Sequence, residues 1–310
     1  MNFQLSLVIG TRSSALAVCQ SQWVQHLLLK EHPHLAIELK KIKTTGDKLL
    51  DAPLVQIGGK GAFTSEIEQA LLKKEIDLAV HSTKDLPTKL AQGLVVGAVL
   101  KRDDVRDVLV TNKARSLETL PEGSRIGTSS LRRKAVLASL YPKFKLVEMR
   151  GNVDTRLKKL DEGQVDALVL ASSGLQRLGL QHRITEFLDP EVFFPAIGQG
   201  ALLIERREHD VRVEKLIFNL NHPQSALIIE AERAFLETLE GGCQVPAGCF
   251  SSLVNGQFKM VASLFSPDGK QQVKKEIQGQ SSQASELGKS LARHLLEGEG
   301  KKILNEIRKI

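Results

Sequence analysis

The sequence predicts an α/β protein of two lobes, followed by a small α+β domain at the C-terminus. Apolar runs typical of strands alternate with amphipathic helical runs through the first two thirds of the chain, as in sheets covered on both faces by helices. From about His222 the pattern changes to one helix followed by strands that Asn-Gly and Asp-Gly turns connect. A chain of 310 residues is long enough for two or three such domains.

The elements of the two lobes follow one another along the chain. Strands are expected where apolar and β-branched residues gather, at 4–10, 35–44, 77–82, 93–100, 107–111, 124–128, 145–150, 166–171 and 201–207. Helices are expected where apolar residues recur at helical spacing, at 14–30, 64–73, 130–140, 153–161 and 174–178.

Two segments look like crossings between the lobes, "LKRDDVRD" around Arg102 and "FFPAIGQG" around Pro195. We therefore expect an α/β domain 1 of residues 1–101 and 198–220 and an α/β domain 2 of residues 102–197. Ligands of such folds bind in the cleft between the lobes. Residues 221–310 form the expected α+β domain 3, with helices at 223–240 and 283–296 around the strands.

Composition sets the expected class of protein. The 42% hydrophobic content includes no apolar run long enough to cross a bilayer, which excludes a membrane-spanning protein. The N-terminus lacks the basic start and small-residue cleavage site of a secretory signal, so we expect a cytoplasmic protein that does not bind membranes. We also expect a monomer, because no large exposed apolar stripe is evident.

The net charge of +7 suggests an anionic partner. Aromatic residues make up only 4% of the chain and no stacking motif or finger spacing appears, so nucleic acid is not expected to be that partner.

The three cysteines form no disulfide framework. Cys19 lies in a helical pattern and is expected to be a small core residue, and Cys249 opens an alternating run typical of a strand. Cys243 and Cys249 lie too far apart, with no nearby His, for a zinc site, so we predict no metal. Cys243 follows Gly241 and Gly242 in "LEGGCQVPAG", which indicates either a reactive thiol projecting from a loop or a packed one.

Polar residues cluster where strands end. Lys84 and Asp85 follow the strand "DLAVHS", at the sheet edge where ligands of open α/β sheets bind. Arg132 and Arg133 stand in the first turn of a helix, where cations oppose the helix dipole, after the hydroxyls of "GTSS". This combination favours a site for a carboxylate or phosphate. The alternative is a helix that simply tolerates two solvated arginines.

More arginines lie at similar positions, namely Arg12, Arg150, Arg156 and Arg177. Because arginine binds carboxylates bidentately, so many in one cleft suit a substrate with several carboxylates. The glycine-containing stretch "TTGDKLLDAPLVQIGGKGAFTSEIE" lacks the spacing of a phosphate-binding loop and is interpreted as a mobile lid that opens into a helix.

Ten motifs in order along the chain resemble those of porphobilinogen deaminase, also called hydroxymethylbilane synthase. They are "GTRSSALA", "TTGD", "GGKGAF", "HSTKDLPT", "RDDVRDVLV", "IGTSSLRR", "RGNVDTRL", "ASSGLQRLG", "PAIGQGAL" and "GGCQVPAG". The resemblance implies that the two lobes are similar to those of type II periplasmic binding proteins. It also implies a transferase of tetrapyrrole (porphyrin and haem) biosynthesis that deaminates four porphobilinogen molecules and joins them head to tail into hydroxymethylbilane, with ammonia released.

The same resemblance implies roles for individual residues. Cys243 matches the family cysteine that holds the dipyrromethane cofactor, the primer for elongation, through a thioether. Asp85 matches the catalytic carboxylate. Phe63 is implied to stack near the reacting ring and Lys60 to belong to the lid. The residues implied to bind cofactor and substrate are Arg12, Ser14, Lys84, Thr128, Ser129, Ser130, Arg132, Arg133, Arg150, Arg156, Arg177 and Gln199.

Two other classes of function remain open at this point. A solute-binding protein of the same two-lobed architecture would explain the cleft and the arginines, but it would need neither Cys243 nor Asp85. A basic nucleic-acid-binding protein would show an affinity that falls steeply with salt.

Overall fold

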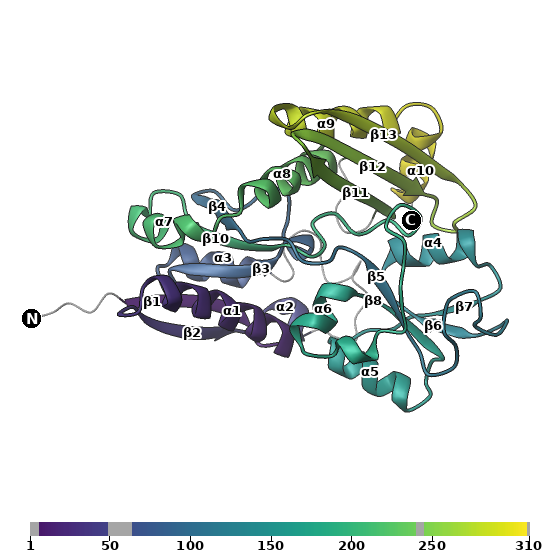
Figure 1. The fold of residues 1–310 in the computed structure, drawn as a ribbon, viewed down its shortest axis with the longest axis horizontal. Helices are drawn as coiled ribbons and strands as arrows, with labels where there is room; N and C mark the ends of the chain where they lie inside the picture. The colour runs from purple at the N-terminus through teal and green to yellow at the C-terminus, as the bar shows by residue number, and fades with distance from the viewer. Residues whose placement is uncertain (1–5, 49–63, 240–244, 309–310) are drawn as a thin grey trace, which may run out of the picture. The chain divides into compact units, whose positions relative to one another are not determined.

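The computed structural model describes residues 6–48, 64–239 and 245–308 (Figure 1). Contacts divide the chain into two compact units. The first unit comprises Met1–Arg102 and Ala201–Ala226, and the second comprises Asp103–Gly200 and Leu227–Ile310. The described residues form a mixed five-stranded sheet in each unit and a three-stranded antiparallel sheet near the C-terminus, which confirms the predicted α/β fold class with a small α+β part.

The sheet of the first unit has the order β2-β1-β3-β10-β4. Its strands are β1 (Ser6–Arg12), β2 (Ala36–Ile42), β3 (Leu78–Ser82), β4 (Leu94–Val99) and β10 (Leu202–Arg207). β1 runs parallel to β2 and to β3, whereas β10 runs antiparallel to β3 and β4. The parallel strands β1 and β3 therefore end at the same edge of the sheet.

Helices cover both faces of this sheet because successive strand residues point to opposite sides. On β3, Leu78 and Val80 pack in the cluster that includes α1 (Ala15–Glu31), whereas Ala79 packs in the cluster that includes α3 (Ser65–Leu72). The remaining helical segments of this unit are α2 (Thr45–Lys48), η1 (Thr83–Asp85), α7 (Val211–Ile217) and η3 (Phe218–Leu220).

The sheet of the second unit has the order β7-β6-β8-β5-β9. Its strands are β5 (Asp107–Val110), β6 (Arg125–Gly127), β7 (Lys145–Val147), β8 (Ala167–Ala171) and β9 (Glu186–Phe187). One face packs against α4 (Leu131–Leu140), and the other against α5 (Val153–Asp161) and α6 (Ser172–Arg177). A short helical turn, η2 (Gln181–Arg183), follows α6.

The C-terminal part of the second unit is a sheet of β11 (Ala247–Val254), β12 (Gln257–Phe265) and β13 (Gln272–Gln280). The Asn-Gly turn predicted between the first two strands is confirmed: Asn255 and Gly256 have φ angles of 49° and 75°, as a tight hairpin requires. The helical segments η4 (Ser281–Gln283), α9 (Ala284–Leu295) and α10 (Glu299–Ile307) complete this part, together with the residues of α8 (Pro223–Thr238) from Leu227 onward.

The strands and helices expected for the two lobes are all present, with ends shifted by a few residues. The sequence did not predict α2, α7 or β9, which are too short to establish a period. Cys249 lies buried in β11 as predicted, but the core position predicted for Cys19 is wrong, since that side chain is half-buried on α1. The three domain ranges stay a prediction.

Candidate active site

The first group of site residues lies where β1 and β3 end. β3 is buried almost throughout, and η1 follows it at once, so that Asp85 stands exposed just beyond the strand. A cavity of about 20 Å³ lies there, lined by Arg12, Ala17, Gln20, Thr64, Val80, His81, Ser82 and Asp85. The parallel arrangement of β1 and β3 thus brings Arg12 and Asp85, both predicted site residues, to one cavity.

Hydrogen bonds fix the edge of the sheet that carries Asp85. Gln20 on α1 donates to the hydroxyl of Ser82 at 2.8 Å, and the backbone N–H of Thr83 donates to the carbonyl of Ala201 at 3.1 Å. Ser14 caps α1, because its hydroxyl accepts from the N–H of Ala17 at 3.3 Å. Lys84 is half-buried on the same turn as Asp85.

The structure also reveals a buried ionisable pair beside this cavity that the sequence analysis did not predict. Nε2 of His81 lies 3.0 Å from Oε2 of Glu205 on β10, and the side chains are 4% and 0% exposed. Burial and then the charge of Glu205 raise the pKa of Glu68 on α3 above its usual range. The only sequence signal was a His and a Glu inside otherwise apolar strands, 124 residues apart.

The second group of site residues surrounds Asp107, the first residue of β5, in the other unit. Oδ2 accepts from Nη1 of Arg132 at 2.7 Å and Oδ1 accepts from Nη2 of Arg133 at 2.7 Å. Gln199 donates to the same carboxylate at 2.9 Å and to the carbonyl of Val105 at 2.8 Å. Three predicted site residues therefore meet at a carboxylate that the sequence had shown only as the start of a strand.

Electrostatics in this cluster are dominated by burial and charge pairing. Burial alone would raise the pKa of Asp107, but the two guanidinium charges and their hydrogen bonds hold it well below its usual range. Burial lowers the pKa of Arg132, and the charge of Asp107 opposes that effect. With two cations and one anion, the cluster keeps one net positive charge.

The cluster also has donors to spare. Arg132 and Arg133 are 5% and 6% exposed, and Nε of each has no hydrogen-bond partner among the described residues. A buried donor without a partner is costly, so an anion that reaches these groups would be bound strongly. The arginines oppose the dipole of α4 at its first turn, as predicted from the sequence, and Asp107 offsets part of that repulsion.

The hydroxyls before α4 shape the backbone at its start. Thr128 is buried and its hydroxyl accepts from the N–H of Ser130 at 3.2 Å, while the hydroxyl of Ser130 caps the helix through the N–H of Arg133 at 3.4 Å. Ser129 lies half-buried between them.

The three remaining arginines lie outside this cluster. Nε of Arg150 pairs with Glu148 at 3.0 Å, and Nε of Arg156 donates to the carbonyl of Gly151 at 2.8 Å. Arg177 binds Asp103 at 2.8 Å and donates to the carbonyl of Gly200 at 2.7 Å. Three predicted site residues, Lys60, Phe63 and Cys243, lie outside the described residues.

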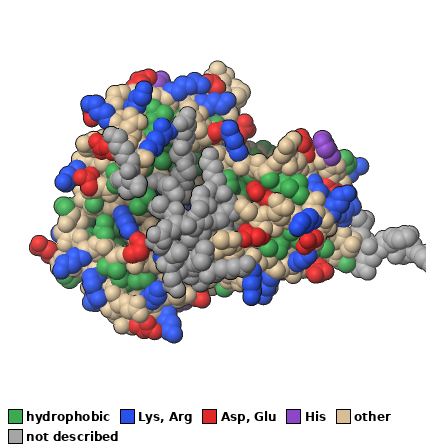
Figure 2. Space-filling model, turned by 180° about the vertical axis from the view of Figure 1, so that it is seen from behind, with side chains coloured by type: hydrophobic (Ala, Val, Ile, Leu, Met, Phe, Trp, Pro, Cys, Tyr) green, Lys and Arg blue, Asp and Glu red, His purple; other side chains and the backbone are tan. Residues whose placement is uncertain are grey.

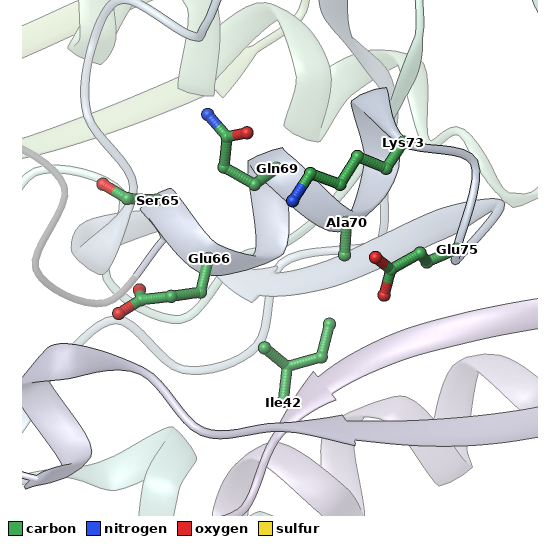
Figure 3. A pocket seen from close by; sticks show the side chains of 7 residues that line it. All are labelled: Ile42, Ser65, Glu66, Gln69, Ala70, Lys73 and Glu75. Carbon is green, nitrogen blue, oxygen red and sulfur yellow. The ribbon is translucent and has the colours of Figure 1, made fainter.

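A second hollow in the first unit contains none of the predicted site residues. It has a volume of about 450 Å³ and lies between α3 and the end of β2 (Figure 3). In Figure 3 the carboxylates of Glu66 and Glu75 flank the aliphatic side chains of Ile42 and Ala70. Glu75 pairs with Lys40 at 2.9 Å, and Glu66 accepts from the N–H of Thr45 at 2.7 Å. These contacts tie helix and strand ends together.

The described part of the chain offers neither a metal-binding cluster nor a membrane-spanning helix. No group of three or more His, Cys, Asp or Glu side chains there could hold a metal ion. Within the same residues, no helix is both long and apolar enough to cross a membrane. Figure 2 shows that Lys and Arg side chains are interspersed with Asp and Glu side chains over the described parts of one face.

Comparison with known proteins identifies the family. Residues 7–215 match the family described as "Porphobilinogen deaminase, dipyromethane cofactor binding domain", and residues 226–297 match "Porphobilinogen deaminase, C-terminal domain". The porphobilinogen deaminase of Syntrophobacter fumaroxidans is 47% identical over 299 residues, which cover 96% of this chain and 97% of the relative. That of Pelobacter propionicus is 47% identical over 301 residues, with 97% of each chain covered.

Among solved structures, a nutrient binding protein from Burkholderia cenocepacia bound to methionine aligns with a TM-score of 0.44 and 15% identity. The alignment covers 72% of this chain and 95% of that one. The two family matches and the near-complete alignments at 47% identity lead to one conclusion: the chain belongs to the porphobilinogen deaminase family.

Proposed function

We propose that this chain is a hydroxymethylbilane synthase, a transferase of tetrapyrrole biosynthesis. It deaminates four porphobilinogen molecules and condenses them head to tail into hydroxymethylbilane, with release of ammonia. Membership of the family supports the reaction. The observation that carries the assignment of residues is the buried arginine pair at Asp107, which retains positive charge and unpaired donors.

The arginine pair fits the dipyrromethane cofactor. Each of its pyrroles carries an acetate and a propionate, and Nε of Arg132 and of Arg133 are buried donors that lack partners among the described residues. Arginine is suited to such carboxylates because its donors form a planar fork. When bound, the dipyrromethane supplies the pyrrole carbon to which substrate is joined.

We assign the remaining binding contacts to the other predicted residues. Arg12, Ser14, Lys84 and Gln199 belong to this group, together with the hydroxyl turn 128–130 and with Arg150, Arg156 and Arg177. The partners of Arg177 and Gln199 within the chain hold these side chains in place, which reduces the entropy lost when they bind a carboxylate. Lys60 and Phe63 are proposed to belong to the lid and to stack on the reacting ring.

Asp85 is the proposed catalytic residue. It stands exposed beyond a buried strand, on the cavity that Arg12 also lines, so its carboxylate is held by a rigid element yet open to substrate. A carboxylate there accepts hydrogen bonds from pyrrole N–H groups, stabilises positive charge that develops on the substrate, and accepts the proton lost from the ring.

We further propose that Cys243 is the attachment point, that the chain consists of the three domains predicted above, and that it acts as a cytoplasmic monomer on porphobilinogen without nucleic acid or membrane. The grouping of Ala201–Ala226 with the N-terminal residues supports a first domain built from two segments.

The intact mass of the purified protein tests this assignment. We expect an added mass equal to two porphobilinogen units less two ammonia molecules, and peptide mapping should locate it on Cys243. Cys243→Ser should abolish the addition, whereas Cys19→Ser should retain it. An unmodified protein that gains no mass on incubation with porphobilinogen would refute the proposal.

A further inference from the structure

The buried pair of His81 and Glu205 has no part in the function proposed so far. The two residues lie on adjacent antiparallel strands: His81 is opposite Leu203 in the register, and Glu205 is two positions further along β10. Both therefore point to the same sheet face as Ala79, which packs there in an apolar cluster with Ile67 of α3. The side chains meet at 3.0 Å with almost no exposure.

Stability does not explain such a pair. Taking two ionisable groups out of water is expensive, and apolar residues of similar volume are often as stable or more stable at such positions. Hydrogen bonds do not fully offset the cost of desolvating Glu205, because its Oε1 has no hydrogen-bond partner among the described residues. A buried polar atom without a partner calls for an explanation such as a catalytic role, and His81 lines a cavity that the proposed catalytic residue Asp85 also lines.

The position of the imidazole suggests which role. His81 lines the cavity of about 20 Å³ that Arg12 and Asp85 also line. Since Nε2 faces the carboxylate of Glu205, the other ring nitrogen, Nδ1, is left to exchange a proton. A cavity of this volume can hold one water molecule, through which a proton can pass between two groups. Other charged groups near the ring are Glu68 on α3, whose carboxylate interacts electrostatically with His81, and Arg12 and Asp85, which line the same cavity.

We propose that His81, held by Glu205, acts through Asp85 by accepting the proton that Asp85 takes from the reacting ring. This inference rests on the proposed function. Each condensation removes one proton from a ring carbon and releases one ammonia molecule from the aminomethyl group of the substrate. The proton passes from the ring carbon to the Asp85 carboxylate, then to Nδ1 of His81, and leaves with the released ammonia as ammonium. Asp85 is thereby ionised again before the next of the four condensations.

The test uses the full-length enzyme with its cofactor and compares three variants. H81L/E205L replaces both partners by apolar residues, and E205Q keeps the shape of Glu205 but removes its charge. L203A is the matched control. Leu203 is buried and lies opposite His81 in the strand pairing, but its side chain has no proton to exchange. Turnover of porphobilinogen by the wild type is measured first. If the wild type shows no turnover, the proposed function itself fails, and this outcome is distinct from a failure of the role proposed for His81.

We expect kcat of H81L/E205L to fall about 100-fold, the low end of what general acid–base groups contribute, with KM unchanged. Protonation of His81 at acid pH stops it from accepting a proton, so the acid limb of the wild-type kcat profile includes His81. In the double variant that limb should move to lower pH. E205Q should show a smaller fall, and L203A should lose thermal stability but keep the wild-type limb.

A second readout does not depend on turnover. The ¹⁵N resonances of the His81 ring, followed against pH in the apo-protein, should change at a lower pH in D85N than in wild type, because D85N removes a negative charge that favours the charged ring. The proposal is overturned if the kcat profile of H81L/E205L coincides with that of L203A, or if D85N leaves the ring titration unchanged. A rise in KM without movement of the acid limb would likewise reduce the pair to a structural role.

Discussion

Replacing Asp107 by Asn tests the electrostatic design of the arginine cluster. The carboxylate accepts from Arg132, Arg133 and Gln199 at 2.7, 2.7 and 2.9 Å and is 0% exposed, so Asp107→Asn leaves two buried guanidinium groups without their counter-charge. Removing one partner of a buried ion pair costs about 3–5 kcal/mol. At about 2–4 °C per kcal/mol for a unit of this size, Tm should fall by about 6–20 °C.

The pH dependence of that loss gives a second check. Because the pKa of Asp107 is depressed in the folded protein, its contribution to stability is complete above the ordinary pKa of an aspartate and is lost as pH falls through the depressed value. Asp107→Asn should therefore flatten the decline in stability of the wild type at strongly acid pH. The variant should also gain more Tm than the wild type does when the cofactor is present, because the cofactor carboxylates restore negative charge.

The assay is thermal unfolding followed by circular dichroism from about pH 2 to 7, on apo- and cofactor-loaded protein. Asp104→Asn is the matched control, because that carboxylate is partly exposed and pairs with Arg106. A change in Tm no larger than that of the control, or an acid slope identical to that of the wild type, would refute the reasoning.

Three further predictions concern single residues. Asp85→Asn should lower turnover of porphobilinogen about 10²- to 10⁴-fold with Tm unchanged, since the side chain is exposed; retention of activity within a few-fold would contradict its role. Arg132→Lys should destabilise the second unit in urea titrations. Nη1 of Arg132 donates to Asp107 at 2.7 Å and to the carbonyl of Phe194 at 2.5 Å, and a lysine ammonium cannot reproduce this planar fork. An unchanged urea midpoint would contradict this prediction. Gly248→Ala should cost about 1–3 kcal/mol in thermal unfolding, because a Cβ there would lie 2.7 Å from the carbonyl oxygen of Phe194; wild-type stability would show that the backbone yields.

Local patterns were sufficient to predict most of the fold. Alternation of apolar residues located β1 and β3, and the turn "GTSSLRR" located the start of α4 with its two arginines, because each of these signals lies within about ten residues. The polar residues that follow predicted strands also indicated that Asp85 and Arg12 lie on the ligand-binding side of the α/β fold, because each directly follows such a strand.

Long-range pairings could not be predicted in the same way. Arg132 finds Asp107 25 residues earlier, on a strand that runs antiparallel to its neighbours, and nothing local in "RDDVRD" indicates which of its acidic residues turns inward. Glu205, the partner of His81, lies 124 residues away, because β10 belongs to the first sheet but follows all strands of the second sheet along the chain. Strand order and register decide such contacts, and one sequence does not encode them in any local period.

The position of β10 has a consequence for biosynthesis. In the first sheet it lies between β3 and β4, yet about 100 residues, 103–200, are translated before it. At about 5–20 residues per second, β3 and β4 emerge from the ribosome roughly 5–20 s before the strand that pairs with both. During that interval each presents an unpaired edge, which invites association with other nascent chains. The N-terminal unit cannot complete its sheet until the strand has been synthesised, so the second sheet has time to form first, and chaperones that cover strand edges would act chiefly on residues 78–99.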